Sequence, residues 1–431
     1  MQNLVWLDYL KLRAAYGAVG NCQSATAYAY WPLYSSVGIP IDGEYSIIPA
    51  QLAAANVKWE STNTFDIALE GSLFNERLGF SIGFFNKYNS DLLFNEAKAL
   101  SSGTIGNGGS NPTVLANIGT MRNTGWELAF YGDVIRNREF TWSLNLDATF
   151  LKNKIVKLPD HRTTFAGSSI RAEGLSVYEF FCYPWAGVDQ LTGQSLYLID
   201  KNSYDYCSYD ENYNLIFDED VYNQNIETAR QEGQLVEYNG QLYTTNYNYA
   251  GRVKSGTSIP TVYGSFGTNL SWKGINLGAL FTYSLGGKTL DSNYASYMIV
   301  GDQPGALHKD MLNAWTQAPE GMTADSPNRI DPNGVPQANT FLGGYSTSSW
   351  STRFLTSSNY LVFKNLNISY DLPSKWMKAI QVQNLNVGVS IDNLFTLTKR
   401  KGLNPQQSWS GGQGNTYVTA RVYSFQLTAR F

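Results

Sequence analysis

Apolar and polar side chains alternate along much of this chain with a period of two residues. The clearest case is the last stretch, Thr419 to Phe431. One phase of that stretch is apolar and consists of Tyr423, Phe425, Leu427, Ala429 and Phe431. The opposite phase is polar, because it holds Ser424, Gln426, Thr428 and Arg430. Since successive side chains of a β-strand point to opposite faces, this alternation predicts a strand with one apolar and one polar face.

The same alternation predicts about twelve strands, each long enough to cross a bilayer as a tilted strand. Two of them carry Trp126 to Phe130 and Phe140 to Phe150, and a hairpin is expected around the D-Q-L-T-G-Q sequence at 189–194. A short helix is expected near Ala306 to Trp315. The other strands are expected near residues 10–17, 63–73, 78–94, 262–272, 275–283, 360–372, 385–393 and 419–431.

The connections between these strands alternate in length. Counted back from the C-terminus, every second connection is short, and the others run from roughly twenty to seventy residues. This pattern predicts an all-β fold, a transmembrane antiparallel up-and-down β-barrel with short periplasmic turns and long extracellular loops. Both chain ends then lie on the periplasmic side. A soluble sandwich with Greek-key crossings has no reason to segregate its loops in this way.

The acidic residues of the predicted strands agree with a membrane wall. They fall in the polar phase, which would face the lumen: Asp66, Glu70, Glu127, Asp147 and Asp392. A lysine or arginine on the lipid face costs about 2–4 kcal/mol at mid-bilayer and little near the interface. Lys364 and Arg421 fall in the apolar phase, and we expect both near the outer interface.

Composition narrows the function classes. The chain has 431 residues, of which 43% are hydrophobic, 14% aromatic and 15% charged, and its net charge of −4 excludes a basic stripe for nucleic acid. Cys22, Cys182 and Cys207 form no metal knuckle or disulfide framework. The sequence has no apolar run long enough for a transmembrane helix. It also does not begin with the basic start and apolar core of a signal peptide, so if the protein is exported, we expect its N-terminal part to be missing from this sequence.

Several separated motifs resemble the SusC/RagA-like TonB-dependent transporters of the Bacteroidetes outer membrane. The resemblance runs over residues 1–431 and matches the C-terminal half of such a protein, without its signal peptide, TonB box and plug domain. Family barrels have roughly 22 strands around a plugged lumen. Ala15 stands where the family usually has Ser or Thr, and the run at 356–365 lacks the usual charges. The motifs are K-L-R-A-A-Y-G-A-V-G-N (11–21), M-R-N-T-G-W-E-L (121–128), W-A-G-V-D-Q-L-T-G (185–193), S-L-G-G-K (284–288) and N-L-F-T-L-T-K (393–399).

The resemblance implies energy-coupled import of a glycan, an oligosaccharide or a peptide. It implies a SusD-like surface lipoprotein as lid, and TonB-ExbB-ExbD acting through the missing N-terminal part. It also implies contact with outer-membrane lipid. The barrel-assembly machinery would read the last strand as its signal, through Tyr423, Phe425, Leu427 and Phe431.

Candidate binding residues are restricted to loop aromatics, because an aromatic face offers apolar area beside a polar edge. They could stack on sugar rings or pack on a partner protein, although self-packing of the loops explains any one of them equally well. The six candidates are Trp31, Tyr34, Tyr204, Tyr206, Trp350 and Trp409.

Neither catalysis nor a cofactor is predicted. His161 and His308 have no metal-ligand spacing, and the G-T-I-G-N-G-G run at 103–109 does not complete a phosphate-binding loop. The loop aspartates have no EF-hand register, so a solvated loop is favoured over a calcium site; they are Asp200, Asp205, Asp210, Asp218 and Asp220. No catalytic triad can be argued, so we expect a non-enzyme.

Two other function classes stay open. A siderophore- or cobalamin-type TonB-dependent receptor would share the barrel and plug but would need no lipoprotein lid. A passive outer-membrane channel or structural barrel would conduct without TonB. The sequence does not name the substrate.

Overall fold

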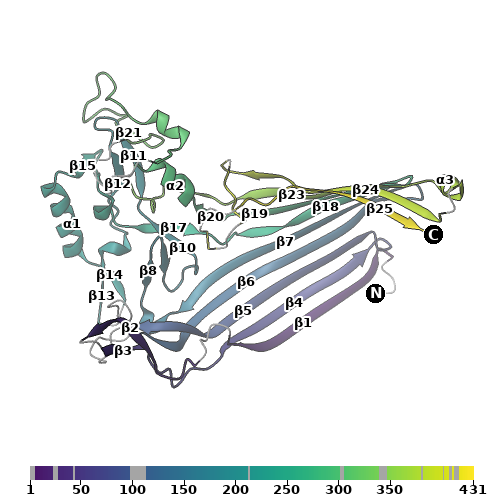
Figure 1. Cartoon of the computed structure of the whole chain (residues 1–431), viewed down its shortest axis with the longest axis horizontal. Coiled ribbons are helices and arrows are strands. Elements are labelled where there is room, and N and C mark those ends of the chain that lie inside the picture. The colour runs from purple at the N-terminus through teal and green to yellow at the C-terminus, as the bar shows by residue number, and fades with distance from the viewer. Residues whose placement is uncertain are drawn as a thin grey trace.

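The computed structural model describes most of the chain. The described residues are 5–22, 28–41, 44–97, 113–211, 214–300, 305–338, 347–379, 382–400, 402–406, 410–411 and 417–431. They form one large antiparallel sheet, which we call the wall, and a separate group of short strands and helices at one end of it, which we call the head (Figure 1).

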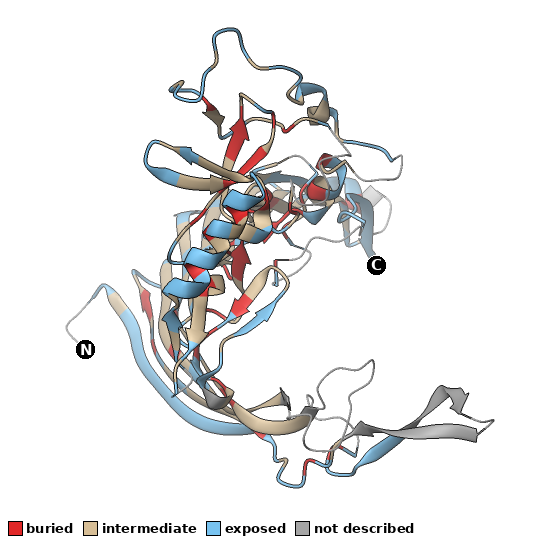
Figure 2. Ribbon diagram, turned by 90° about the vertical axis from the view of Figure 1, so that its left-hand side faces the viewer, coloured by how far each residue is buried: buried red, intermediate tan, exposed pale blue. Residues whose placement is uncertain are grey.

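The wall has ten strands among the described residues, each antiparallel to its neighbours. Their order in the sheet follows their order in the chain, apart from the short strands of the connections. The sheet curves through an arc, as the second view shows (Figure 2). In sheet order the strands are β1 (Leu7–Asn21), β4 (Glu60–Leu73), β5 (Leu78–Ala97), β6 (Thr113–Arg136), β7 (Phe140–Lys157), β18 (Val262–Trp272), β19 (Ile275–Leu285), β23 (Tyr360–Asp371), β24 (Asn384–Thr398) and β25 (Val422–Arg430).

The register of the wall brings the predicted apolar phases onto one face. Phe84 of β5 lies opposite Ile67 of β4 and Trp126 of β6, and Trp126 in turn lies opposite Phe150 of β7. A one-residue slip of any strand would move its apolar set to the other face. The polar face carries the predicted charges, with Glu70 bridging to Lys11 at 3.5 Å and to Arg13 at 3.2 Å.

The alternation of short and long connections is confirmed. Residues 74–77, 137–139, 273–274 and 372–383 join strands at one end of the wall, where the N- and C-termini also lie (Figure 1). The longer connections all leave from the opposite end, which we call the rim. The first of these holds the hairpin of β2 (Leu33–Ile41) and β3 (Glu44–Gln51).

The number of wall strands differs from the predicted count. The hairpin expected around 189–194 exists, but its strands belong to the head and not to the wall. Most of their side chains are buried in a small sheet, and a short apolar run of this kind does not by itself distinguish a buried strand from a membrane strand. These strands are β11 (Trp185–Asp189) and β12 (Ser195–Leu198).

A β-bulge explains why Lys364 falls in the apolar phase of the sequence. The register of β23 against both neighbours shifts between Phe363 and Asn365. Lys364 is therefore the extra residue of the bulge, and its Nζ donates to Asn393 Oδ1 at 2.9 Å. The strand regains its alternation beyond the bulge, so the charge is accommodated without breaking the apolar face.

The head is built from two distant segments, residues 158–261 and 286–359. Its two larger sheets are β17-β10-β9-β8 and β15-β16-β12-β11-β21, and two-stranded sheets join β13 to β14 and β20 to β22. Because β21 comes from the second segment and pairs with β11 of the first, strand pairing joins the two segments. The remaining strands are β8 (Thr164–Ala166), β9 (Ser169–Arg171), β10 (Glu179–Cys182), β13 (Cys207–Tyr209), β14 (Leu215–Phe217), β15 (Leu235–Tyr238), β16 (Gln241–Thr244), β17 (Val253–Thr257), β20 (Lys288–Leu290), β21 (Ile330–Asp331) and β22 (Leu355–Ser357).

Helices are few and short. Asp218 caps the longest one, because its carboxylate accepts from the backbone N–H groups of Asp220 and Val221 at 3.1 Å. The helix predicted near 306–315 is a 3₁₀ turn. The helices are α1 (Glu219–Gln231), α2 (Ser292–Met298) and α3 (Ser374–Ala379), with 3₁₀ turns η3 (Pro159–His161), η4 (Tyr204–Tyr206), η5 (Tyr247–Tyr249) and η6 (Lys309–Asn313). Among the described residues no helix is long and apolar enough to cross a membrane.

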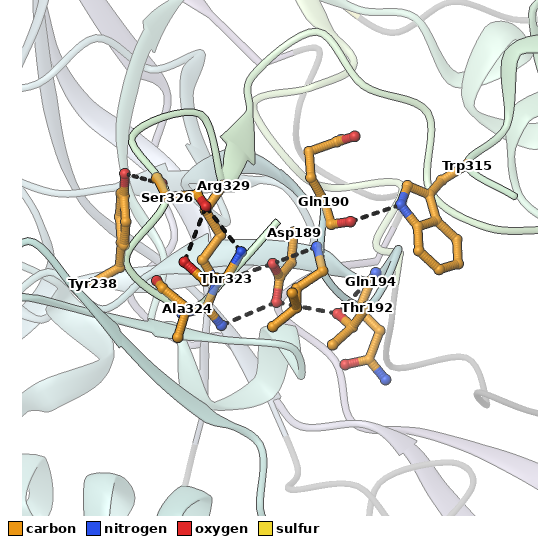
Figure 3. A network of polar contacts seen from close by, with 11 residues as sticks. Asp189, Gln190, Thr192, Gln194, Tyr238, Trp315, Thr323, Ala324, Ser326 and Arg329 are labelled. Carbon is orange, nitrogen blue, oxygen red and sulfur yellow. Dashed lines mark hydrogen bonds and ion pairs between the residues drawn. The ribbon is translucent and has the colours of Figure 1, made fainter. Parts of the chain in front are cut away.

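Buried side chains gather in the head, whereas the wall is mostly exposed or half-buried (Figure 2). One head core contains Phe180, Leu290, Met298 and Phe354. The tip of the β11–β12 hairpin is fixed by Asp189, whose carboxylate receives the Arg329 guanidinium (Figure 3). The head is therefore a packed domain, and the wall is a two-faced sheet.

Candidate functional site

The polar face of the wall carries a groove lined by asparagines. It has a volume of about 590 Å³ and crosses β7, β18, β19 and β23. Five described asparagines line it. Within the described part of the chain the side chains of Asn145, Asn269 and Asn367 make no hydrogen bond. Because a primary amide both donates and accepts, such groups suit hydroxyls or peptide groups of a ligand. We call this the asparagine groove: Asn145, Asn269, Asn276, Asn365 and Asn367.

Neighbouring carboxylates hold the other two asparagines in place. Asn276 Nδ2 donates to Asp371 Oδ2 at 3.0 Å, and Asn365 Nδ2 donates to Asp392 Oδ1 at 2.7 Å. Sequence analysis placed Asp392 in the lumen phase but did not single out the asparagines. A signal for them was present in the sequence, because asparagines such as Asn365 and Asn367 are two residues apart and therefore point to the same face of a strand.

A smaller pocket lies at the rim, where the head meets β18, β19 and β23. Its volume is about 220 Å³, and hydroxyl groups dominate its lining. Lys288 is the one charged side chain among its described lining residues, and its Nζ donates to the carbonyl of Ser255. We call this the rim pocket, lined mainly by Ser258, Ser284, Lys288, Thr289, Ser358 and Tyr360.

The glycines of the S-L-G-G-K motif allow the head to approach the wall here. Gly286 has φ +94°, and a Cβ there would lie 2.4 Å from Thr261 Oγ1. A Cβ on Gly287 would lie 2.6 Å from the carbonyl oxygen of Ser258. A side chain at either position would therefore require the neighbouring residues to move, which explains on steric grounds why both positions are glycine.

Glu179 lies beside the rim pocket region, on β10. Its carboxylate accepts from the N–H of Gly256 at 3.0 Å. Burial raises the pKa of Glu179, while the Gly256 hydrogen bond and the nearby charges of Lys254 and Lys288 act in the opposite direction.

The predicted loop aromatics do not form one cluster. Trp31 and Tyr34 lie in the first rim connection and are exposed, and Trp31 lies 5.6 Å from the Tyr30 ring between centroids. Trp350 is exposed on the head, with its ring beside Gly167. Trp409 lies outside the described residues.

Tyr204 and Tyr206 are placed very differently, although they are neighbours in η4. Tyr204 packs edge-on against Phe181 at 6.0 Å and lies under Lys254. Tyr206 is only 3% exposed, and its hydroxyl donates to the carbonyl of Tyr249 at 2.7 Å. Burial raises the pKa of Tyr206. Its ring is therefore part of the head core in this conformation, and the ligand-binding role of these aromatics stays a prediction.

The last strand has the predicted faces. Tyr423, Phe425 and Leu427 lie opposite Ile391, Val389 and Val387 of β24. Among the described residues β24 is the only wall neighbour of β25, and the Phe425 side chain is 85% exposed. Phe431 follows the strand and is also exposed. Its role in assembly stays a prediction.

The histidines and loop aspartates make local structural contacts. His161 Nδ1 lies 3.0 Å from Glu173, and His308 Nδ1 accepts from the N–H of Asp310. Asp205 pairs with Arg252 at 2.8 Å. In the part of the chain that the structure describes, no three His, Cys, Asp or Glu side chains gather as metal ligands. The glycine run at 103–109 lies outside that part.

The fold and sequence were compared with known proteins. No protein-family model matches the chain. The TonB-dependent receptor P3 of Formosa agariphila is 26% identical over 98% of this chain and 39% of its own length. SusC of Bacteroides thetaiotaomicron is 24% identical over 99% of this chain and 38% of its own length. The chain thus spans about two fifths of the curated relatives it matches.

A solved structure agrees. The RagAB peptide transporter superposes with a TM-score of 0.73 at 22% identity, over 99% of this chain and 41% of the other. The chain is a relative of the SusC/RagA-like TonB-dependent transporters. The resemblance expected from the separated motifs is thereby confirmed.

The similarity to SusC and to the RagAB transporter agrees with a place for the wall in the bacterial outer membrane, as part of a β-barrel. The apolar face of the wall is then the lipid face and the polar face lines the lumen. The asparagine groove lies on the lumen face, and the rim pocket lies where the head joins the wall.

Proposed function

We propose that the protein carrying this chain imports a bulky polar nutrient, a glycan, an oligosaccharide or a peptide, across the outer membrane with energy from TonB. In this proposal residues 1–431 supply the C-terminal part of the barrel. A SusD-like lipoprotein acts as the lid, and TonB-ExbB-ExbD acts through the N-terminal part. The role is transport, not catalysis.

One observation carries the proposal. The relatives that align over nearly the whole chain include proteins named as TonB-dependent receptors, and the aligned fold carries a polar, largely uncharged lumen groove. A groove of asparagine amides supports a ligand rich in hydroxyl or peptide groups, because it can exchange hydrogen bonds with such a ligand without carrying a net charge.

The test is an uptake assay in the host bacterium. Disruption of the gene is expected to abolish uptake of one fluorescent oligosaccharide or peptide class, and collapse of the proton gradient is expected to do the same. Uptake that survives collapse of the gradient would favour a passive channel. A lipoprotein that copurifies with the protein separates the lidded importer from a siderophore-type receptor.

The tryptophans predicted to lie in loops allow a second test of the proposal. Replacing Trp31, Trp350 and Trp409 together by alanine is expected to weaken binding of the ligand or of the lipoprotein, because stacking area is lost. Trp272, an exposed tryptophan beside the short turn at 273–274, is the matched control. Unchanged binding of both partners by the triple variant would remove these residues from the proposal.

A further inference from the structure

Four polar side chains of the rim pocket lack partners in the described part of the chain. The hydroxyls of Ser284, Ser358 and Tyr360 make no hydrogen bond there. The side-chain amide of Gln406 makes none among these residues either. Hydroxyls and primary amides can each donate and accept. Grouped around one cavity of about 220 Å³, they can therefore exchange hydrogen bonds with a polar ligand.

These groups are reachable from the pocket. Ser284 is only 7% exposed, but within the described residues its hydroxyl is not one of the side-chain atoms that are both sealed from solvent and unpaired. The hydroxyl thus keeps contact with the space that Ser284 lines. Tyr360 lies directly opposite Ser284 in the pairing of β23 with β19. Both are out of phase with Phe281 and Phe363 of the apolar face, so their side chains emerge on the polar face of the wall.

Apolar surface lies beside the polar groups. Pro260 and Pro405 line the same pocket and are buried, and Tyr360 contributes an aromatic ring. A sugar ring has a matching division, because its hydroxyls project from the edge while C–H groups cover its faces. The C–H groups can pack on an aromatic or proline ring while the hydroxyls bond the polar groups around it. The lining therefore matches a saccharide better than a ligand that is apolar throughout.

Size and charge restrict the ligand further. Pockets that hold drug-sized ligands measure about 300–1,000 Å³, so the rim pocket has room for one small ring and not for several. Lys288 carries the one charge among the described lining residues, and its Nζ donates to the carbonyl of Ser255. Its charge also acts on the carboxyl of Glu179. A neutral ring therefore suits the pocket better than an anion, which would compete with Glu179 for Lys288.

We propose that the rim pocket seats one neutral sugar ring of the imported ligand. The ring exchanges hydrogen bonds with the hydroxyls of Ser284, Ser358 and Tyr360, and with the Gln406 amide at the edge of the pocket. A sugar ring brings several hydroxyls into one small volume, whereas a peptide brings one side-chain group, so four unpaired groups favour the sugar. The inference rests on the proposed import function and narrows its substrate class from glycans, oligosaccharides or peptides to saccharides.

The test measures binding of single sugar rings to the protein, purified in a detergent without a sugar head group. The probes are the methyl glycosides of glucose, galactose and mannose, and N-acetylalanine amide is the matched peptide unit. Saturation-transfer NMR detects contact at millimolar concentrations, and a titration gives Kd. At least one glycoside is expected to bind about tenfold more tightly than the peptide unit, because it makes more hydrogen bonds.

Two substitutions test the pocket itself. Tyr360→Phe removes the hydroxyl and keeps the ring, and Gln406→Ala removes the amide. Each is expected to weaken glycoside binding about fivefold, which corresponds to one hydrogen bond. Tyr370→Phe is the matched control, because Tyr370 lies on the same strand far from the rim, opposite Ile275, and should leave binding unchanged. Since the Tyr360 hydroxyl has no partner among the described residues, Tyr360→Phe should keep the wild-type thermal midpoint.

Three results would overturn the inference: no binding of any glycoside, equal binding of glycoside and peptide unit, or wild-type affinity in both Tyr360→Phe and Gln406→Ala. A lower midpoint of Tyr360→Phe would also count against it, because the hydroxyl would then serve the fold. Energised import of a peptide by a protein that binds no sugar ring would leave the proposed function standing while this inference fails. Absence of energised uptake would remove the proposed function itself.

Discussion

Arg329 and Asp189 form a two-pronged ion pair inside the head, with Nε 3.1 Å from Oδ1 and Nη2 3.2 Å from Oδ2 (Figure 3). The Asp189 side chain is 1% exposed and that of Arg329 is 10% exposed. Asp189 also accepts from the N–H of Leu191 and the hydroxyl of Thr192. One carboxylate therefore fixes both the tip of the β11–β12 hairpin and the second head segment.

Breaking this pair should destabilise the head. Arg329→Met leaves the Asp189 charge buried without its partner, which costs about 3–5 kcal/mol. Faster cleavage of the head by a protease, measured on the purified protein, is the expected result. Arg230→Met is the matched control, because its pair with Glu227 is exposed and should contribute less than about 1 kcal/mol. Equal cleavage rates for the two variants would contradict the prediction.

Gly193 at the same hairpin should not accept alanine. Its φ is +73°, and a Cβ there would lie 2.2 Å from the Trp315 ring. Gly233 has a similar φ of +68° but open space around it. Gly233→Ala should therefore cost only about 1 kcal/mol for the backbone conformation, whereas Gly193→Ala must also displace Trp315. Thermal unfolding followed by Trp fluorescence compares the two, and equal midpoints would speak against the clash.

The wall could be predicted from the sequence because its strands have a strict period of two and one apolar face. Phe84, Trp126 and Phe150 reveal their shared face by their phase alone. The bulge at Lys364 could not be predicted, because one extra residue changes the phase without leaving a signature in composition. The 189–194 hairpin was assigned to the wall for a different reason, because its short strands are largely buried in the head and a short apolar run does not show which sheet it joins.

The head was beyond sequence reasoning for a different reason. Its strands are short and pair across long separations, as Val188 does with Asp331. Helix α1 did carry a signal, an Asp218 cap followed by Tyr222, Ile226 and Ala229 at helical spacing, but it lies within a polar stretch that reads as a loop. The rim pocket draws its lining from both head segments and from β19 and β23, and no local pattern in the sequence encodes that meeting.

A lysine should be tolerated on only one face of β6. Leu128 lies on the lipid face, opposite Ile82 and Ala148. Leu128→Lys should cost about 2–4 kcal/mol if the site lies near the bilayer midplane. Ala129→Lys points to the lumen, where Asp147 lies opposite, and should be nearly neutral. Urea unfolding in lipid vesicles measures both, and similar costs would overturn the assignment of the faces.

Acid should loosen the start of α1. The backbone N–H groups of Val221 and Asp220 and the Ser208 hydroxyl lower the pKa of Asp218. A carboxylate with a lowered folded pKa contributes stability that is present above its ordinary pKa of 3.8 and is lost as the pH falls through the lower folded value. Hydrogen exchange of α1 should therefore accelerate below that ordinary value. Asp218→Asn caps without titrating, so its exchange should show no such step.

The aromatic end of the chain should matter for insertion. If Phe431 is read as an assembly signal, Phe431→Ala should lower the amount of folded protein in the outer membrane several-fold, without changing the thermal midpoint of the protein that does fold. Arg430→Ala, on the polar phase of the same strand, is the control. Wild-type amounts of folded Phe431→Ala protein would remove Phe431 from the assembly role.

The two segments of the head are separated in the chain by the hairpin of β18 and β19, yet they meet in pairs such as Tyr183 with Ser351 and Val188 with Asp331. Closing such contacts in a free chain carries the entropy cost of long loops. Once β7, β18, β19 and β23 have paired in the wall, the ends of both head segments already lie next to one another, so most of that entropy cost has been met. The head should thus form late, and its native packing reports that these four strands have registered correctly.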